Sequence, residues 1–356
     1  MRQLITLLCL ISLPLVYTTK AQNYAFNKSE EAKDEIKNGE PIEKNYDAAP
    51  INELVINNEH GYITVSPWDQ ESINIRAVVH IETTNEEEAK EILEFLSFEE
   101  KRFSHKLQFS TVFDEHFFSN YTFTVNYDIK VPSRLNISVN NTIGDVKIND
   151  IKGIINLKHS YGNLDISNIG MDKEHTFELS FIEGVINTLG SAKAKLSNCT
   201  LNINNATSIK GQTSYCMASI VNTQSLNINT FTDRLIISNT DSLTLKGEQF
   251  IGKVEQLKNY LFCELKKGKL TVDTQESLSE LTISNKRVET SITVPPSLSY
   301  IINGEVTNGS FTHPSPQMLQ VFKENDNVTF SGKVGNEINA ANLILFNKDA
   351  SITIKN

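Results

Sequence analysis

Residues 141–153 read NTIGDVKINDIKG, and residues 159–171 read HSYGNLDISNIGM, so the chain repeats nearly the same phrase about 18 residues later. Each phrase contains a glycine, a short polar side chain and then alternating apolar and polar residues. Such alternation is typical of a short β-strand with one buried face. Recurrence at a fixed spacing is the signature of stacked structural repeats, so these two phrases indicate the fold class.

The repeat continues along the chain. With Ile148 as an anchor, apolar residues recur at steps of about 17–19 residues, at Ile166, Val185, Ile203, Ile220 and Ile237. A second, interleaved set consists of Leu157, Leu179, Leu196, Ile209, Ile228 and Leu245. A single short strand cannot bury its apolar face alone, whereas stacked copies can. The pattern predicts an all-β fold, a β-solenoid (β-helix-like) with about two short strands per 17–19-residue turn. An antiparallel meander would also explain short strands, but it does not explain the near-constant period.

The sequence divides into four segments. We expect a signal peptide at 1–21, a flexible charged linker at 22–47, a small N-terminal β module with one short helix at 48–130, and the β-solenoid with C-terminal capping strands at 131–356. The helix is predicted from TTNEEEAKEILEFL, which offers a capping residue, a glutamate-rich first turn and apolar residues at helical spacing. The final NLILFNKDASITIKN is interpreted as a hairpin that closes the last open sheet edge.

The N-terminus has the features of an export signal. Arg2 precedes an apolar run, and Thr19 and Ala21 fit the small-residue positions before a cleavage point at Gln22. The apolar run is shorter than the roughly 20 residues that a spanning helix needs, so we expect export without a transmembrane segment in the mature chain. The protein would then be in the periplasm, at the cell surface or extracellular.

The charge balance excludes one class of partner. The chain has 43 acidic and 33 basic residues and a formal net charge of −10. Nucleic-acid binding normally requires clustered Lys and Arg side chains, so no nucleic-acid partner is expected.

Three stretches together suggest a family. These are NNEHGYITVSPWDQESINIRA, YDIKVPSRLNISVNNTIGDVKI and SGKVGNEINAANLILFNKDASITI. They resemble the putative adhesin family of secreted bacterial β-solenoid proteins, a domain of unknown function. The resemblance covers most of the mature chain and rests on strand alternation and turn residues. It therefore implies the fold, and it carries over no functional residues.

Signatures of common enzymes are missing from the sequence. It contains no phosphate-binding glycine loop, GxSxG, HExxH or CxxC motif, and its histidines have no metal-binding spacing, so we assign no cofactor and no metal. The alternative function is a glycan-active enzyme, a polysaccharide lyase or hydrolase on a β-helix scaffold. Its candidate residues are Asp145 and Asp165 with Lys147, which alternate with the inward apolar residues. A solvated polar face explains them equally well.

Weak candidates for binding come from exposed aromatic residues. Trp68 lies in a turn, and Tyr161 and Tyr215 occupy the same point of their periods. All three can also serve to cover corners or strand ends. Cys199 and Cys216 each lie four residues before an anchor, so they should stack in consecutive turns, where strand spacing permits a disulfide or two buried thiols. Cys263 has no evident mate.

These observations predict a secreted or cell-envelope, adhesin-like protein without catalysis. It would present a rigid repeat face to a glycan or to a protein partner of the cell envelope or surface. A binding protein should show a ladder of Asn, Ser, Thr and aromatic side chains, whereas an enzyme should show a groove lined by clustered charged side chains.

Overall fold

The strands of the protein form one large mixed sheet. The computed structural model describes residues 40–83, 85–114, 117, 122–336 and 338–356, and these described residues belong to one compact unit. Within the described residues the fold is all-β, with a single α-helix and one short 3-10 helix. The expected signal peptide and the expected linker as far as residue 39 lie outside the described residues.

The N-terminal strands begin earlier than expected. The elements are β1 (Ile42–Asp47), β2 (Glu53–His60), β3 (Ile63–Pro67), β4 (Ser72–Ile81), α1 (Glu86–Glu94), β5 (Leu96–Phe103), β6 (Lys106–Phe113) and β7 (Phe123–Val131). β1 pairs antiparallel with β4 and buries Tyr46. The expectation of a linker up to residue 47 is therefore wrong at its end, because one buried tyrosine and sheet pairing outweigh the polar composition of this strand.

The N-terminal strands join the sheet of the segments that follow. β4 pairs antiparallel with β1 and β7, and β5 pairs antiparallel with β6. β2 and β3, by contrast, pair in parallel with β8 (Asn136–Ile143) and β9 (Val146–Asn149). The chain on either side of residue 130 thus contributes to the same sheet.

The short helix α1 confirms the sequence prediction. Its cap is Asn85, whose side-chain oxygen accepts a 2.9 Å hydrogen bond from the amide of Glu87. Three glutamates occupy the first turn, where the helix dipole favours negative charge. Ala89 and Ile92 are the buried residues that hold the helix against the sheet.

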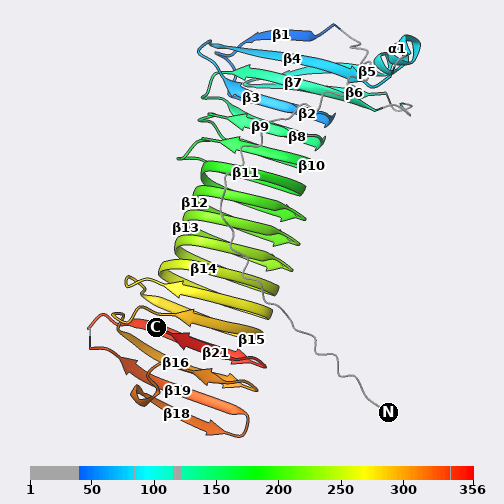
Figure 1. Ribbon diagram of the computed structural model, residues 1–356. Coiled ribbons are helices and arrows are strands. Elements are labelled where there is room, and N and C mark those ends of the chain that lie inside the picture. The colour runs from blue at the N-terminus through cyan, green and yellow to red at the C-terminus, as the bar shows by residue number, and fades with distance from the viewer. Residues whose placement is uncertain (1–39, 84, 115–116, 118–121, 337) are drawn as a thin grey trace, which may run out of the picture. The chain divides into compact units, whose positions relative to one another are not determined.

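The middle of the protein consists of parallel strands (Figure 1). They are β8, β9, β10 (Ile155–Ser167), β11 (Glu174–Ser197), β12 (Thr200–Ser214), β13 (Met217–Phe231), β14 (Arg234–Thr274) and β15 (Glu280–Thr293). Every pairing among these described strands is parallel, so an antiparallel meander is wrong here. We call a segment that pairs in parallel with the segments before and after it a rung.

The register of the rungs corrects one predicted anchor. Ile166 pairs with Ile186, not with Val185, and Ile186 pairs with Ile203. Ile186 is 2% exposed, whereas Val185 is 36% exposed and stands opposite Asp165. The rung that leads from Ile166 to Ile186 is longer than its neighbours, with partners 20 residues apart instead of 18 or 17. Because side chains alternate, a slip of one residue moves the wrong residue to the core.

The second predicted set of apolar residues does not form one column. Ile209 shares a column with Ala192, Leu226 and Leu243, while Ile228 stands opposite Gly211 and Leu245. Pairing between β11 and β12 comes in three runs, at residues 183–186, 188–189 and 191–197 of β11. Pairing between β10 and β11, by contrast, comes in two runs, as expected for two strands per period. The expectation therefore fits the first rungs, whereas from β11 to β14 unpaired corner residues divide the pairing into three runs.

One corner of each rung is a residue with left-handed backbone. These residues have φ between 54° and 65°, and they are Tyr161, Phe181, Asn198, Tyr215, Thr232, Gln249, Lys267 and Arg287. Such a conformation costs a non-glycine residue roughly 1–2 kcal/mol, so tight stacking must hold it in place.

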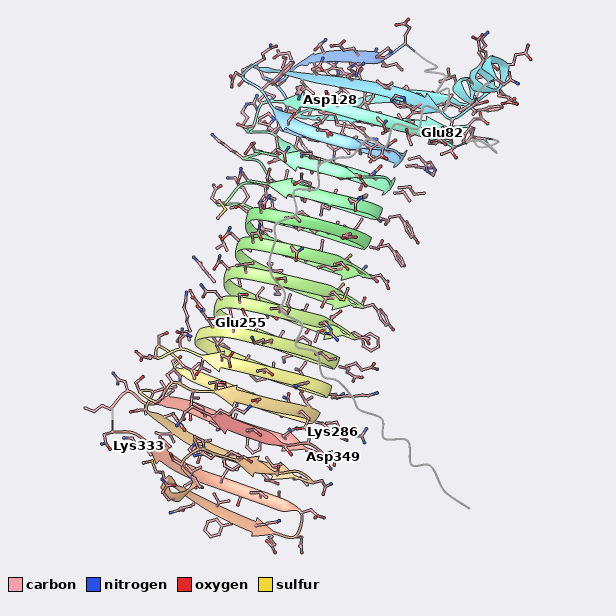
Figure 2. The ribbon with its side chains drawn as sticks, in the orientation of Figure 1. Glu82, Asp128, Glu255, Lys286, Lys333 and Asp349 are labelled. Carbon is pink, nitrogen blue, oxygen red and sulfur yellow. The ribbon has the colours of Figure 1, made fainter. Side chains whose placement is uncertain are left out.

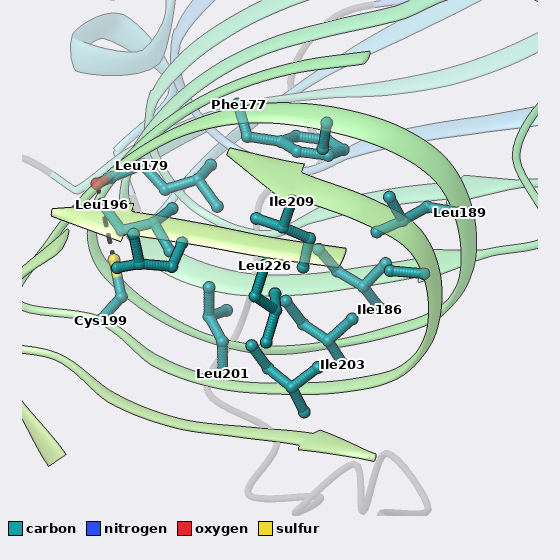
Figure 3. Close-up of a cluster of buried hydrophobic side chains, with 14 of the residues drawn as sticks. Phe177, Leu179, Ile186, Leu189, Leu196, Cys199, Leu201, Ile203, Ile209 and Leu226 are labelled. Atoms are coloured by element: carbon teal, nitrogen blue, oxygen red, sulfur yellow. Dashed lines mark hydrogen bonds between the residues drawn. The ribbon is translucent and has the colours of Figure 1, made fainter. Parts of the chain in front are cut away.

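The core runs inside the rungs (Figure 3). Phe177, Leu179, Ile186 and Leu189 point into it from one rung, and Leu201 and Ile203 lie beneath them in the next. All six side chains are buried. Stacking thus produces a continuous apolar interior from rungs that could not bury their apolar residues individually.

The C-terminal strands are ordered differently from the prediction. They are β16 (Tyr300–Thr307), β17 (Phe311–Thr312), the 3-10 helix η1 (Pro316–Met318), β18 (Leu319–Glu324), β19 (Asn327–Val334), β20 (Ala341–Lys348) and β21 (Ile352–Lys355). β20 pairs with both β15 and β16, so it is an interior strand. The expectation that the final strands close the open edge is wrong. Beyond β16 the sheet continues through β19 to β18, which forms the edge.

Candidate functional site

Exposed aromatic side chains gather at the left-handed corner of the rungs. Register places Tyr161, Phe181, Asn198 and Tyr215 at this corner in four consecutive rungs. Tyr161 is 53% exposed and Tyr215 is 56% exposed. The structure thus places both predicted tyrosines at the same position of their rungs, at the surface.

The rings at this corner contact one another in pairs. Tyr161 and Phe181 stack with their centroids 4.8 Å apart and their planes 6° apart. Tyr215 meets Phe231 edge to face at 5.5 Å. We call these four residues the aromatic corner. In the first pair each ring covers a face of the other, whereas an edge-to-face contact covers a face of only one of the two rings. Phe231 is 40% exposed.

A groove of about 460 Å³ lies beside Phe231. One side of it is a row of side chains that stand opposite each other in register, Lys195, Gln212, Asn229 and Lys246. The other side carries Ser197, Ser214 and Phe231, again in register. We call this feature the rung groove. Its direction, across the strands, is set by the parallel register.

The floor of the rung groove is held by a buried carboxylate. Asp233 accepts 2.5 Å hydrogen bonds from the hydroxyls of Thr213 and Thr230, both of which lie along the floor. It also accepts hydrogen bonds from the amides of Cys216, at 2.7 Å, and Phe231, at 3.2 Å. Asp233 is almost fully buried, so these four donors replace its water. The network fixes the backbone of Phe231 on the groove wall.

A glycine continues the floor at one end of the rung groove. Gly247 has φ of +145°, and a Cβ there would lie 1.8 Å from the carbonyl oxygen of Thr230. No other residue type fits this close approach without displacing the neighbouring rung. Glycine at this position therefore allows the two rungs to stack closely beneath the groove.

The charged groups of the rung groove lie at its ends. Lys195 approaches Glu178 at 3.4 Å, and Lys246 approaches Glu264 at 3.6 Å and lies over the ring of Phe262. The middle of the row is formed by the neutral amides of Gln212 and Asn229. Among the described residues that line the groove, none is Asp or Glu. The arrangement offers amide and hydroxyl groups beside an aromatic ring, which suits polar, uncharged ligands.

A second groove, of about 430 Å³, lies on the N-terminal strands β3, β4 and β7. Its lining includes Tyr62, Arg76, Asp128 and Lys130, and Asp128 projects from this part of the protein in Figure 2. Lys130 lies 3.6 Å from Asp128 and donates to the hydroxyl of Ser66 at 2.8 Å. Register also sets Arg76 opposite Asp128. Cross-strand charge pairing of this kind is common on exposed sheets.

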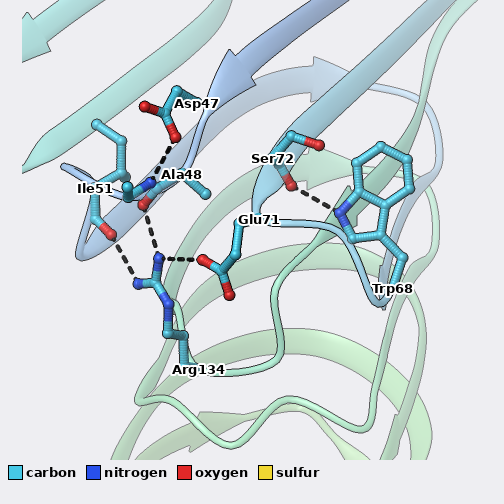
Figure 4. A network of polar contacts seen from close by, with 8 residues as sticks. Asp47, Ala48, Ile51, Trp68, Glu71, Ser72 and Arg134 are labelled. Atoms are coloured by element: carbon cyan, nitrogen blue, oxygen red, sulfur yellow. Dashed lines mark hydrogen bonds and ion pairs between the residues drawn. The ribbon is translucent and has the colours of Figure 1, made fainter.

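Trp68 is not part of the aromatic corner. In the N-terminal strands, the residue at the same corner position is His60, which precedes β3. Trp68, by contrast, follows the end of β3. Its indole N–H donates a 2.7 Å hydrogen bond to the carbonyl of Ser72, which closes the turn (Figure 4). In the same view Arg134 donates to the carbonyls of Ile51 and Ala48. Trp68 is half-buried, and its contacts brace the turn.

The residues proposed for glycan chemistry are engaged with other groups. The Lys147 ammonium lies 2.8 Å from the carboxylate of Asp165, which stands opposite it in the next rung. Asp145 accepts hydrogen bonds from the amide and side chain of Asn163, at 2.8 and 3.0 Å. Register thus sets Asp165 beside a lysine instead of beside Asp145.

The two predicted cysteines lie in adjacent rungs as free, buried thiols. The amide of Met217 donates to the carbonyl of Cys199, which fixes Cys216 and Cys199 at equivalent positions. A hydrogen bond from the Cys216 thiol lowers the pKa of Cys199 to about 7, and the same contact raises the pKa of Cys216. Cys263 is buried beside Asn285, away from this pair.

Sequence reasoning missed the residues that form the rung groove. Gln212 and Asn229 are ordinary polar residues, and only the register sets them side by side. Phe181 was missed because the longer rung shifts it off the average period. Phe231 could have been noticed as an aromatic residue within NTFTD, next to the left-handed Thr232.

Comparison with known proteins yields only distant likenesses. No protein-family model matches the chain, and no curated protein matches it. A putative cell adhesion protein from Clostridium sporogenes is similar at 12% identity and a TM-score of 0.22, over 89% of this chain and 99% of that chain. A putative adhesin from Parabacteroides distasonis has 12% identity and a TM-score of 0.25, over 89% of this chain and 98% of that chain. For one from Bacteroides fragilis the values are 10% and 0.22, over 90% and 98%. At these scores the likeness assigns neither family nor function.

The part of the chain that the structure describes contains no candidate for a membrane-spanning helix. No helix there has the length and the apolar composition needed to cross a bilayer.

Proposed function

We propose that the protein is an exported, adhesin-like member of the putative adhesin family and that its rungs form a β-solenoid. Parallel pairing at a spacing of 17 residues over several rungs supports the solenoid. The family resemblance of its sequence supports the assignment, and the leader-like N-terminal sequence supports a location in the periplasm, at the cell surface or outside the cell. The protein acts by binding and not by catalysis.

The rung groove is the observation that carries this proposal. It combines one aromatic ring, Phe231, with amides from Gln212 and Asn229 and hydroxyls from Ser197 and Ser214. Sugar rings present apolar C–H faces and hydroxyl groups, so they match a surface that offers both an aromatic face and neutral hydrogen-bonding groups. The proposed ligand is therefore a glycan that lies along the groove, across the rungs.

A glycan-active enzyme is the less favoured function. A hydrolase needs two carboxyl groups facing one bond, and the acids suggested for this role are each held by another group. The lining of the rung groove supplies lysines only at its ends. The proposal that the protein is not an enzyme rests on the ion pair of Asp165 and the hydrogen bonds of Asp145.

A glycan-binding screen tests the proposal. The chain from Gln22 onward is applied to an array of bacterial and host glycans, and the same glycans are assayed for new reducing or unsaturated ends. We expect saturable binding without product. Phe231→Ala should weaken binding by about tenfold, equivalent to 1.4 kcal/mol. Phe346→Ala is the matched control, because this exposed aromatic side chain lies on β20, outside the groove.

The two possible failures have different meanings. Product release would establish the enzyme and make Asp145 and Asp165 the first residues to replace. Binding that Phe231→Ala and Asn229→Ala leave unchanged would remove the rung groove from the proposal. In that case the N-terminal groove around Tyr62 becomes the next surface to test.

A further inference from the structure

The strand β18 leaves one side of its backbone open. Among the described strands it pairs only with β19, in a continuous antiparallel register from Leu319 to Glu324. Its other side presents amide and carbonyl groups that no described strand satisfies. Figure 1 shows β18 as the last strand beyond β19. An open edge of this kind is a template for another strand, and natural proteins usually protect it.

The β18 edge exposes apolar side chains, although an unpaired edge usually carries residues that prevent another strand from pairing with it. Phe322 is 68% exposed, the largest value for any described aromatic residue, and Val321 and Met318 are also exposed. The strand LQVFKE contains no proline, and its register with β19 shows no bulge. These are the devices that normally block edge pairing, and β18 has only a lysine and a glutamate at its end.

An edge in the N-terminal part of the sheet provides a contrast within the same protein. β5 pairs only with β6 among the described strands. Its sequence LSFEEKRF carries four consecutive charged residues, and Lys101 and Arg102 form ion pairs with Glu99 and Glu100. The protein therefore protects one edge with charge and leaves the other apolar. This difference indicates that the β18 edge has a partner.

We propose that β18 pairs antiparallel with β18 of a second copy of this chain, so that the protein forms a two-fold symmetric dimer through its C-terminal edge. A two-fold axis perpendicular to a sheet sets one residue opposite itself, because facing residues of antiparallel strands point to the same face. Phe322 is the residue on the axis. The two most exposed rings of the C-terminal edge then cover each other.

The strand is self-complementary in this register. Val321 stands opposite Lys323 of the second copy, and Gln320 stands opposite Glu324 of the second copy. No residue faces a like charge, and each charged side chain faces an uncharged one. Aromatic pairs directly across an antiparallel pair are among the stabilising ones, whereas opposed like charges are destabilising. A second copy therefore fits this edge without any change of sequence.

Sedimentation and cross-linking test the dimer. The chain from Gln22 onward is studied by analytical ultracentrifugation over a hundredfold range of concentration, with Phe322→Asp as the variant. We expect a concentration-dependent dimer for the natural chain and at least tenfold weaker association for Phe322→Asp, which opposes two carboxylates on the axis. Under mild oxidation, Phe322→Cys should form an intermolecular disulfide with its own copy. Phe103→Cys on the β5 edge is the matched control and should not.

Circular dichroism melting of each variant shows whether the fold is kept. Exposed positions are replaced in all three, so the melting temperatures should stay close to that of the natural chain. A natural chain that remains monomeric over the whole range overturns the proposal. So does a dimer that Phe322→Asp leaves intact, or a Phe103→Cys variant that cross-links as readily as Phe322→Cys.

Discussion

Cys216 lies directly above Cys199 in the next rung, and both side chains are free thiols in the core. Adjacent strands are about 4.8 Å apart, which is within the Cα separation that a disulfide accepts. Their proximity follows from the 17-residue spacing of the rungs in this part of the chain.

Mild oxidation should join this pair and leave Cys263 reduced. A disulfide donor that exchanges with Cys199 lets the Cys216 sulfur attack the mixed disulfide, so the protein loses two hydrogens and the donor is reduced. Peptide mapping by mass spectrometry after treatment with oxidised glutathione measures the pairing. Cys199→Ser should abolish it and Cys263→Ser should not. A bridge that includes Cys263 would contradict the assigned register.

Replacement of Asp233 should destabilise the protein strongly. Asp233→Ala removes the acceptor for the hydroxyls of Thr213 and Thr230 and for two backbone amides, all inside the protein. Leaving several buried donors without partners should cost about 3 kcal/mol of unfolding free energy. Urea unfolding monitored by circular dichroism measures the loss.

The control for Asp233 is Asp165→Ala. This carboxylate forms an exposed ion pair with Lys147, and such pairs contribute at most about 1 kcal/mol. Equal losses for the two variants would contradict the role of Asp233 as the buried acceptor.

The free energy of unfolding should fall as the pH drops from 7 toward 5. Burial lowers the pKa of His159, His175 and His313 in the folded protein, because the interior disfavours the imidazolium. In the unfolded chain their pKa is about 6.5, so below this pH the unfolded state binds more protons than the folded state. The stabilisation by neutral histidine is thus present above pH 6.5 and is lost below it.

Urea unfolding at a series of pH values measures this slope. His159→Gln should flatten it, since the imidazole of His159 is fully buried and its Nε2 has no hydrogen-bond partner among the described residues. A stability that stays constant between pH 7 and 5 would mean that the three imidazoles become charged within the folded protein.

The register of the longer rung can be tested by two neighbouring substitutions. Ile186→Ala should cost about 2–5 kcal/mol of unfolding free energy, because it leaves a cavity in the core. Val185→Ala should cost no more than about 0.5 kcal/mol, because its side chain faces Asp165 and Asn202 at the surface. If the order of the two losses were reversed, Val185 would be the core residue and the register would shift by one.

The arrangement of the candidate site could be predicted only in part. Tyr161 and Tyr215 share a corner because both follow the repeat, so sequence spacing was sufficient for them. The neighbours Gln212 and Asn229 are unremarkable in sequence and meet only through parallel pairing. Trp68 looked like a contact residue because it is the single tryptophan, but it donates its N–H within its own turn.

Local sequence by itself determined the alternation of apolar and polar residues, the capped helix at Asn85 and the regular recurrence that stacks Ile203 on Ile220. These features depend on interactions between neighbours in the chain or on a strict period. Tertiary structure decided that the rung ending at Ile186 is longer, and that β20 inserts between β15 and β16 instead of closing the edge. Strand order depends on contacts between segments that are distant in the chain, and the apolar patterns of these segments are alike. The position of β18 at the edge therefore becomes evident only in the assembled sheet.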